Sequence, residues 1–168
     1  QEDVPVEIYK EFFEDINSEV DRLNSIISDL LTLVRLDQRE IPLNIKEMNI
    51  GDVLQGILKR LVPLAKNKNI NLIYETHREV IAEIDEVKFS LALTNLIENA
   101  IKYTPEGGSV NVTLQADLQD ASITVADTGI GIAKEEQSKI FERFYRTDKT
   151  RNRETGGTGL GLAITYKT

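Results

Sequence analysis

The chain has 168 residues, which suffices for one ordinary domain with an appendage and excludes two large domains. Its 20 Lys and Arg against 28 Asp and Glu give a net charge of −8, which argues against a nucleic-acid partner because phosphate binding needs basic surfaces. Without cysteine, and with His77 as its one histidine, the sequence excludes disulfides, thiol nucleophiles and the usual structural zinc sites.

A long amphipathic helix is predicted for residues 5–39, where no glycine or internal proline interrupts the pattern. Apolar residues recur there at alternating spacings of four and three, which defines a heptad seam. Ile26, Leu31 and Leu33 widen the stripe and favour a helix of a multi-helix bundle, although a helix folded back on its own domain stays open. The seam consists of Tyr9, Phe13, Ile16, Val20, Leu23, Ile27, Leu30 and Val34.

A mixed domain of short strands and helices is predicted after a break at Pro42. Its first half comprises an edge strand over 43–50, a helix over 51–66 that Pro63 may kink or shorten, strands over 70–75 and 80–84, and a helix capped by Asp85 that runs to Tyr103.

The second half begins with the turn over 105–108, whose proline and glycines end that helix. Alternating apolar residues on either side of a turn over 117–120 predict a hairpin with one buried face. A helix is expected over 134–145, then a charged, mobile loop over 146–158 and a helix over 160–166.

The first of three polar clusters lies on the helix that ends at Tyr103. Asn95, Asn99, Lys102 and Tyr103 share one of its faces, and apolar residues fill the other. Amide oxygens suit a hard cation and a lysine suits phosphate, whereas a solvated face more often carries Glu–Lys pairs. Taken alone, the cluster fits a solvated face as well as a site.

The other two clusters combine a carboxylate with glycines. In Val-Ala-Asp-Thr-Gly-Ile-Gly-Ile (125–132) a strand ends in Asp127, and two glycines then permit close approach of a flat ligand. In Gly-Gly-Thr-Gly-Leu-Gly-Leu (156–162) glycines precede a helix start, where phosphates bind favourably. The glycine spacings match neither a dinucleotide fingerprint nor a P-loop.

In this order, and with Phe-Glu-Arg-Phe-Tyr-Arg (141–146) between the last two, the clusters resemble the N, G1, F and G2 boxes of the sensor histidine kinase ATP-binding domain. The resemblance covers residues 42–168 and implies an α+β fold, a two-layer α/β sandwich of one mixed sheet against helices. The family's domain normally continues past the G2 box, so this domain is expected to be C-terminally truncated. Residues 1–41 resemble the second helix of the family's dimerisation and phosphotransfer bundle.

The resemblance also implies roles for single residues. Asn99 would hold Mg²⁺, and Asp127 would accept the exocyclic amino hydrogen that adenine has and guanine lacks at that position. Gly129 and Gly131 would leave room for the adenine ring, and 147–155 would form an ATP lid hinged by the glycines after it. The expected catalytic residues are Asn95, Lys102 and Arg143, and the expected ATP-binding residues are Asn95, Asn99, Lys102, Tyr103, Asp127, Gly129, Gly131, Ile132, Arg146, Gly157, Thr158, Gly159, Leu160 and Gly161.

The function that the resemblance implies is that of a protein-histidine kinase. In the whole protein, the γ-phosphoryl of Mg-ATP would pass to a histidine and then to an aspartate in the receiver domain of a response regulator. The acceptor histidine is expected outside this chain, because His77 lies in a polar connection and fits an ordinary surface residue. The chain should therefore bind ATP and Mg²⁺ without phosphorylating itself. It would be the cytoplasmic part of a membrane-bound receptor that dimerises through the helical bundle.

Two alternatives have their own signatures. In the related gyrase-like and chaperone ATPases a glutamate general base stands four residues before the magnesium asparagine, where this chain has Asn95. Glu98 could substitute for it, although its position round the helix from Asn95 is expected to prevent this. The second alternative is a non-enzymatic interaction module with a decayed pocket, in which the seam helix carries the function.

Overall fold

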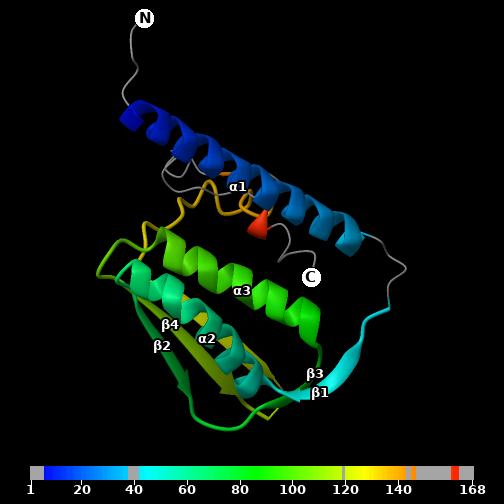
Figure 1. The fold of residues 1–168 in the computed structure, drawn as a ribbon. Coiled ribbons are helices and arrows are strands. Elements are labelled where there is room, and N and C mark those ends of the chain that lie inside the picture. Colours follow the sequence, from blue (N-terminus) through cyan, green and yellow to red (C-terminus); the bar gives the residue numbers. More distant parts are fainter. Residues whose placement is uncertain (1–5, 38–41, 119, 143–144, 147–159, 163–168) are drawn as a thin grey trace, which may run out of the picture.

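The computed structural model describes residues 6–37, 42–118, 120–142, 145–146 and 160–162. Two helices lie side by side across one face of the strands, and the long helix runs above them (Figure 1). This arrangement confirms the predicted α+β fold class. The helices are α1 (Val6–Asp37), α2 (Ile50–Asn67) and α3 (Glu86–Tyr103), and the strands are β1 (Ile45–Asn49), β2 (Asn71–Thr76), β3 (Ile81–Asp85), β4 (Ser109–Ala116) and β5 (Ala121–Asp127).

The strands form two sheets, so the prediction of one mixed sheet is wrong for the described residues. In the larger sheet β4 pairs with β2 in parallel and with β5 in antiparallel register, which confirms the predicted hairpin. In the smaller sheet β1 pairs antiparallel with β3. Each of these two strands passes directly into a helix, β1 into α2 at Asn49 and β3 into α3 at Asp85.

Polar caps fix the starts of both sandwich helices. Asn49 Oδ1 accepts hydrogen bonds from the backbone N–H groups of Gly51 at 2.9 Å and Asp52 at 3.3 Å. Asp85 Oδ1 accepts one from Lys88 at 3.1 Å, as the sequence predicts for this cap. Helix α2 continues through Pro63 to Asn67, so the expected shortening does not occur. Pro63 is exposed, and water can therefore solvate the backbone carbonyl that loses its helical donor.

The core lies between the α2–α3 layer and the larger sheet. Ile97 and Ile101 of α3 and Val110 and Val112 of β4 are each 0% exposed. Burial alternates along β4, so one face of the hairpin packs against the helices as predicted. The remaining core residues are Ile50, Leu54, Ile57, Leu58, Leu61, Ala65, Ile70, Val80, Leu93, Ala100 and Leu114.

The helix predicted over 134–145 is wrong across the described part of that segment, which forms successive turns. Backbone N–H groups bond to carbonyls three residues earlier, from Glu136 to Ala133, from Lys139 to Glu136 and from Glu142 to Lys139. An α-helix needs an apolar face packed against the fold, because short helices are marginal in water. Here Ile140 is half-buried and Phe141 is 41% exposed, so that stabilisation is weak.

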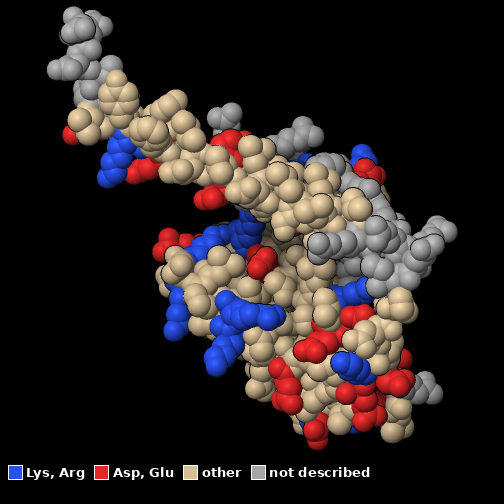
Figure 2. All heavy atoms as spheres, turned by 45° about the vertical axis from the view of Figure 1, so that its right-hand side comes forward, with Lys and Arg blue, Asp and Glu red and all other residues tan. Residues whose placement is uncertain are grey.

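Helix α1 confirms the long helix predicted from the heptad pattern, and it extends beyond the body of the molecule (Figure 2). Its seam residues are between 37% and 60% exposed. Near the other end Leu33 is buried against Leu160 and Leu91, which ties the helix to the sandwich. Among the residues that the structure describes, no helix is both long and apolar enough to cross a membrane.

Candidate functional site

A cavity of about 490 Å³ collects the polar clusters that the sequence singles out. Its walls come from the polar face of α3, the end of β5 and the segment that follows β5. A volume of this size is typical of small-molecule sites. The predicted site residues that line it are Asn95, Asn99, Lys102, Tyr103, Asp127, Gly131, Ile132, Arg146 and Gly161.

The other predicted residues divide into two groups. Gly129 and Leu160 do not line the cavity, and Leu160 is fully buried between α1 and α3 instead. Arg143, Gly157, Thr158, Gly159 and the predicted lid over 147–155 lie outside the described residues, as does most of the helix predicted over 160–166.

A hydrogen bond joins the first cluster to the third. Asn95 Nδ2 donates to the backbone carbonyl of Gly161 at 3.3 Å. A Cβ at Gly161 would come within 3.8 Å of Asn99 Nδ2, so the backbone passes close to both asparagines. Residues separated by more than 60 positions in the chain therefore meet at one wall of the cavity.

Lys102 provides positive charge at the end of α3 inside this cavity. Burial lowers the pKa of its ammonium, the neighbouring Arg146 lowers it further, and Glu98 opposes the change. Its Nζ lies 5.7 Å from the ring centroid of Tyr103, and burial raises the pKa of that phenol. Lys102 and Arg146 together form a cationic wall suited to an anionic ligand group.

Asp127 presents its carboxylate at the end of β5. Its Oδ1 accepts a hydrogen bond from the backbone N–H of Gly129 at 2.8 Å, which fixes the side chain. Asp127 is exposed toward solvent and lines the cavity beside Val125 and Ile132. An acceptor-only group beside apolar side chains is suited to a flat ligand that has an amino group at its edge.

The space beside Gly129 is occupied by atoms of the protein, whereas the expectation was that it would leave room for the adenine ring. A Cβ there would lie 2.5 Å from Asp127 Oδ1 and 2.7 Å from the backbone oxygen of Tyr103. The same oxygen accepts a hydrogen bond from Ile130 N at 3.2 Å. Gly129 thus allows the loop after β5 to touch the end of α3, whereas a Cβ at Gly131 would meet no atom within 4 Å.

Glu98 was expected to lie on a different face of the helix from Asn95. This expectation is wrong, because both side chains line the cavity. Residues three apart on a helix differ by only about 60° around its axis. Desolvation raises the pKa of the Glu98 carboxyl, and the nearby Asp29 raises it further. Sequence reasoning missed Ser25 and Asp29 of α1, which also line the cavity, because contacts between distant elements leave no local pattern.

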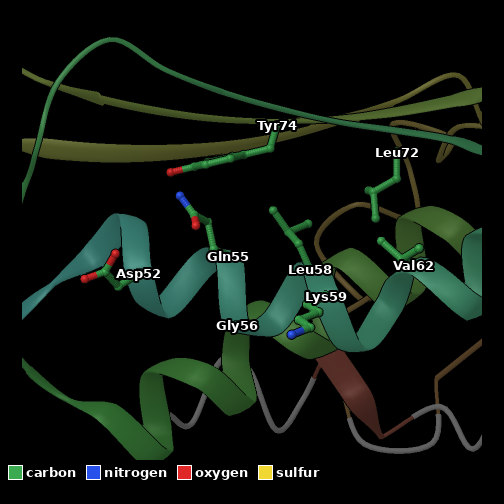
Figure 3. A pocket seen from close by; sticks show the side chains of 8 residues that line it. All are labelled: Asp52, Gln55, Gly56, Leu58, Lys59, Val62, Leu72 and Tyr74. Carbon is green, nitrogen blue, oxygen red and sulfur yellow. The ribbon is translucent and has the colours of Figure 1, made fainter.

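A larger hollow of about 580 Å³ lies between α2 and β2 (Figure 3). The side chain of Gln55 extends there toward the ring of Tyr74, whose hydroxyl is buried and has no hydrogen-bond partner within the described part of the chain. None of the predicted site residues lines this hollow. We favour the smaller cavity as the functional site because it gathers amides, cations and a carboxylate from distant segments.

The donors in the smaller cavity suit a magnesium nucleotide. Asn95 and Asn99 offer amide oxygens, which hard cations accept as ligands. No group of three or more His, Cys, Asp or Glu side chains in the described ranges could hold a metal ion. Magnesium in nucleotide sites commonly keeps several water molecules and binds phosphate oxygens beside one or two protein ligands, which the two amide oxygens would supply here.

Comparisons with known proteins agree with this geometry. The model of the family described as histidine kinase-, DNA gyrase B-, and HSP90-like ATPase matches residues 84–168. The sensor histidine kinase RppB of Synechocystis sp. is 44% identical over 144 residues, which are 85% of this chain and 32% of that protein. The chain thus spans about a third of the length of this curated relative.

Solved structures show the same likeness. The full-length ShkA structure, in complex with AMPPNP, aligns with a TM-score of 0.76 and 30% identity over 94% of this chain and 33% of that one. Histidine kinase ThkA, in complex with the response regulator protein TrrA, aligns with a TM-score of 0.72 and 27% identity over 86% of this chain and 42% of that one.

Proposed function

We propose a nucleotide site on the premise that the chain belongs to the histidine kinase-, DNA gyrase B- and HSP90-like ATPase family, as the ATP-binding catalytic domain of a sensor histidine kinase. In this proposal the smaller cavity, which α3 lines, binds Mg-ATP. The γ-phosphoryl group of the nucleotide then passes to a histidine outside this chain. One observation carries the proposal. The cavity combines the amides and lysine of α3 with the carboxylate of Asp127, so a cation site, a phosphate site and an adenine site adjoin.

Each part of the nucleotide then has a proposed partner. Asn99 would hold Mg²⁺ through its side-chain oxygen, and Asn95, which lines the same cavity, would lie nearby. Lys102 and Arg146 neutralise phosphate charge, and Arg143 adds to this in the proposal. Asp127 accepts a hydrogen bond from the adenine amino group. Bound Mg²⁺ would supply further charge neutralisation, so catalysis is mainly positioning and electrostatics.

The remaining predicted residues surround these contacts with the nucleotide. Gly131 and Ile132 line the space for the base, Tyr103 joins Lys102 on the phosphate side, and Gly161 brings its backbone to Asn95. Buried Leu160 anchors the glycine-rich segment by packing on Leu33. Gly129 allows the loop after β5 to contact the end of α3. Gly157, Thr158 and Gly159 lie outside the described residues, and their part in ATP binding stays a prediction.

The exposed seam of α1 supports a role for residues 1–41 in a dimerisation bundle. Eight seam residues are each more than a third exposed along one helix, and burying such a stripe is what stabilises helical bundles. In the whole protein the histidine would then pass its phosphoryl group to the aspartate of a receiver domain. The crystal structure of ThkA in complex with a response regulator protein supports a response regulator as partner. Membrane attachment of the whole receptor stays a prediction.

A reconstituted transfer assay tests the proposed function. The chain, Mg-ATP labelled on the γ-phosphate and a separately made bundle fragment that contains the acceptor histidine are mixed, and acid-labile phosphate on the fragment is measured. Labelled fragment is the expected result, and Asn99→Ala should abolish the labelling. Binding of Mg-ATP without any transfer to such fragments would refute the kinase assignment, and absence of binding would favour an interaction module.

One observation favours a second candidate, ATP hydrolysis. Glu98 lies in the cavity beside Asn99, and its raised pKa makes the carboxylate a better proton acceptor. Steady release of phosphate that survives Asn95→Ala and is lost with Glu98→Ala would support hydrolysis. We expect slow release that does not depend on Glu98, because a histidine acceptor is nucleophilic without such a base.

A further inference from the structure

Each of the last four backbone carbonyls of α3 accepts a hydrogen bond. The last carbonyls of a helix lack intrahelical partners, and here the four carbonyls of residues 100–103 all receive a donor from elsewhere. The hydroxyl of Thr104 donates to the first at 2.7 Å. The ammonium of Lys68 donates to the second at 3.2 Å and also to the third. The backbone N–H of Ile130 donates to the fourth at 3.2 Å.

Lys68 is the one of these donors that carries charge, and it comes from a different helix. It forms the C-cap of α2, where its backbone N–H bonds to Ala65 O at 3.2 Å. Ile70 N donates to the same oxygen at 2.8 Å, and Asn69 adopts a φ of 53° between them. This closed turn fixes the base of the Lys68 side chain. Helices α2 and α3 end at the same side of the sandwich, which brings the ammonium to the end of α3 (Figure 1).

The carbonyls that Lys68 holds belong to the turn that carries the phosphate-side residues of the cavity. Ile101 is fully buried in the core, whereas the side chains of Lys102 and Tyr103 line the cavity. Lys68 itself does not line it. The helix dipole favours a positive group at the C-terminus of a helix. Hydrogen bonds from such a group to the last carbonyls hold the backbone of the final turn in place.

We propose that Lys68 is a positioning residue of the nucleotide site, because its ammonium binds the carbonyls of Ile101 and Lys102 and so directs Lys102 and Tyr103 toward the phosphates. This inference rests on the proposed function, since it assigns those two side chains to a bound nucleotide. It gives α2, which contributes no residue to the cavity, a part in nucleotide binding.

Three variants of the full chain test the proposal. Lys68→Met keeps most of the side-chain volume without the ammonium, Lys68→Arg keeps a charged donor, and Lys66→Met removes the same charge from an exposed position on the same helix. Calorimetry measures Mg-ATP binding, an NMR shift titration measures adenosine binding, and thermal unfolding checks the fold.

Lys68→Met should weaken Mg-ATP binding roughly tenfold and leave adenosine binding nearly unchanged, because the defect lies on the phosphate side. Lys68→Arg should restore most of the affinity, and Lys66→Met should behave as wild type. Wild-type affinity in Lys68→Met, or an equal loss for both ligands together with a lower melting temperature, would overturn the inference. Failure of the wild-type chain to bind Mg-ATP would instead refute the proposed function on which it rests.

Discussion

Helices α1 and α3 are both amphipathic, and they differ in what covers their apolar faces. The apolar face of α3 packs against α2 and β4, where Ile97 and Ile101 are 0% exposed. The seam of α1 remains 37% to 60% exposed along most of its length. The contrast teaches that an apolar stripe predicts the existence of a partner but not its location. The apolar face of α3 is covered within the sandwich, whereas the described residues leave the seam of α1 exposed, and its partner in a bundle stays a prediction.

The largest effect is expected when the same substitution, isoleucine to alanine, is made in both helices. Ile97→Ala leaves a cavity in the sandwich core and should lower the free energy of unfolding by about 2–5 kcal/mol. Ile27→Ala, at a seam position that is 54% exposed, should change it by less than about 0.5 kcal/mol in the monomer. Urea unfolding followed by circular dichroism measures both. Equal losses in a dilute monomer would mean that the seam is already packed.

A second test compares a glycine at the site with one in helix α2. Gly129→Ala places a methyl group against the backbone oxygen of Tyr103 and should cost about 1–3 kcal/mol. Gly56→Ala meets no atom within 4 Å and should stabilise the chain by about 0.5–1 kcal/mol through helix propensity. Opposite signs in thermal unfolding are expected. A neutral Gly129→Ala would show that the loop does not need this close approach to α3.

A third test measures the cap of α2, which stabilises the sandwich layer and does not involve α1. Asn49→Ala removes the acceptor for Gly51 and Asp52 N–H and should cost about 1 kcal/mol. Denaturant midpoints of the full chain and of a chain lacking residues 1–41 should fall by the same amount. A loss that depends on α1 would mean that the two regions are energetically coupled.

The smallest expected effect is a pH dependence at the cap of α3. Hydrogen bonds from the backbone of Lys88 and of Asn44 lower the pKa of Asp85 from its ordinary 3.8. As pH falls, the unfolded chain takes up this proton first, so the contribution of Asp85 is present above 3.8 and is lost as pH falls through the lower folded value. Asp85→Asn keeps a capping oxygen without titrating, so stability measured at acid pH should decline less steeply. An unchanged slope would contradict the cap assignment.

Much of this fold can be predicted from sequence because local chemistry sets it. The Asp85 cap, the alternation along β4 and the heptads of α1 each depend on residues close together in the chain. The prediction of a helix over 134–145 was wrong because its apolar residues are not buried against the fold. Ile140 is only half-buried and Phe141 is exposed. The division into two sheets also depends on long-range pairing, which no local pattern reports.

The site could be predicted in its residue types but not in its geometry. The asparagines and Asp127 were evident from their motifs, and the fold brings them to one cavity. The parts supplied by distant elements were not evident, namely Asp29 from α1 and the Lys68 ammonium behind Lys102. The contact between Gly129 and Tyr103 O was also hidden, because a glycine in a motif does not reveal which atom occupies the space of its missing side chain.

Calorimetric titration of Mg-ATP into the wild-type chain, Asp127→Asn and the matched control Asp120→Asn tests the nucleotide site most directly. The control makes the same change in the exposed turn at the other end of β5. We predict that wild type and Asp120→Asn bind with equal affinity and that Asp127→Asn binds at least about tenfold more weakly, since it loses a charged hydrogen bond to adenine. Absence of binding in the wild type, or equal affinity in all three chains, would contradict the account.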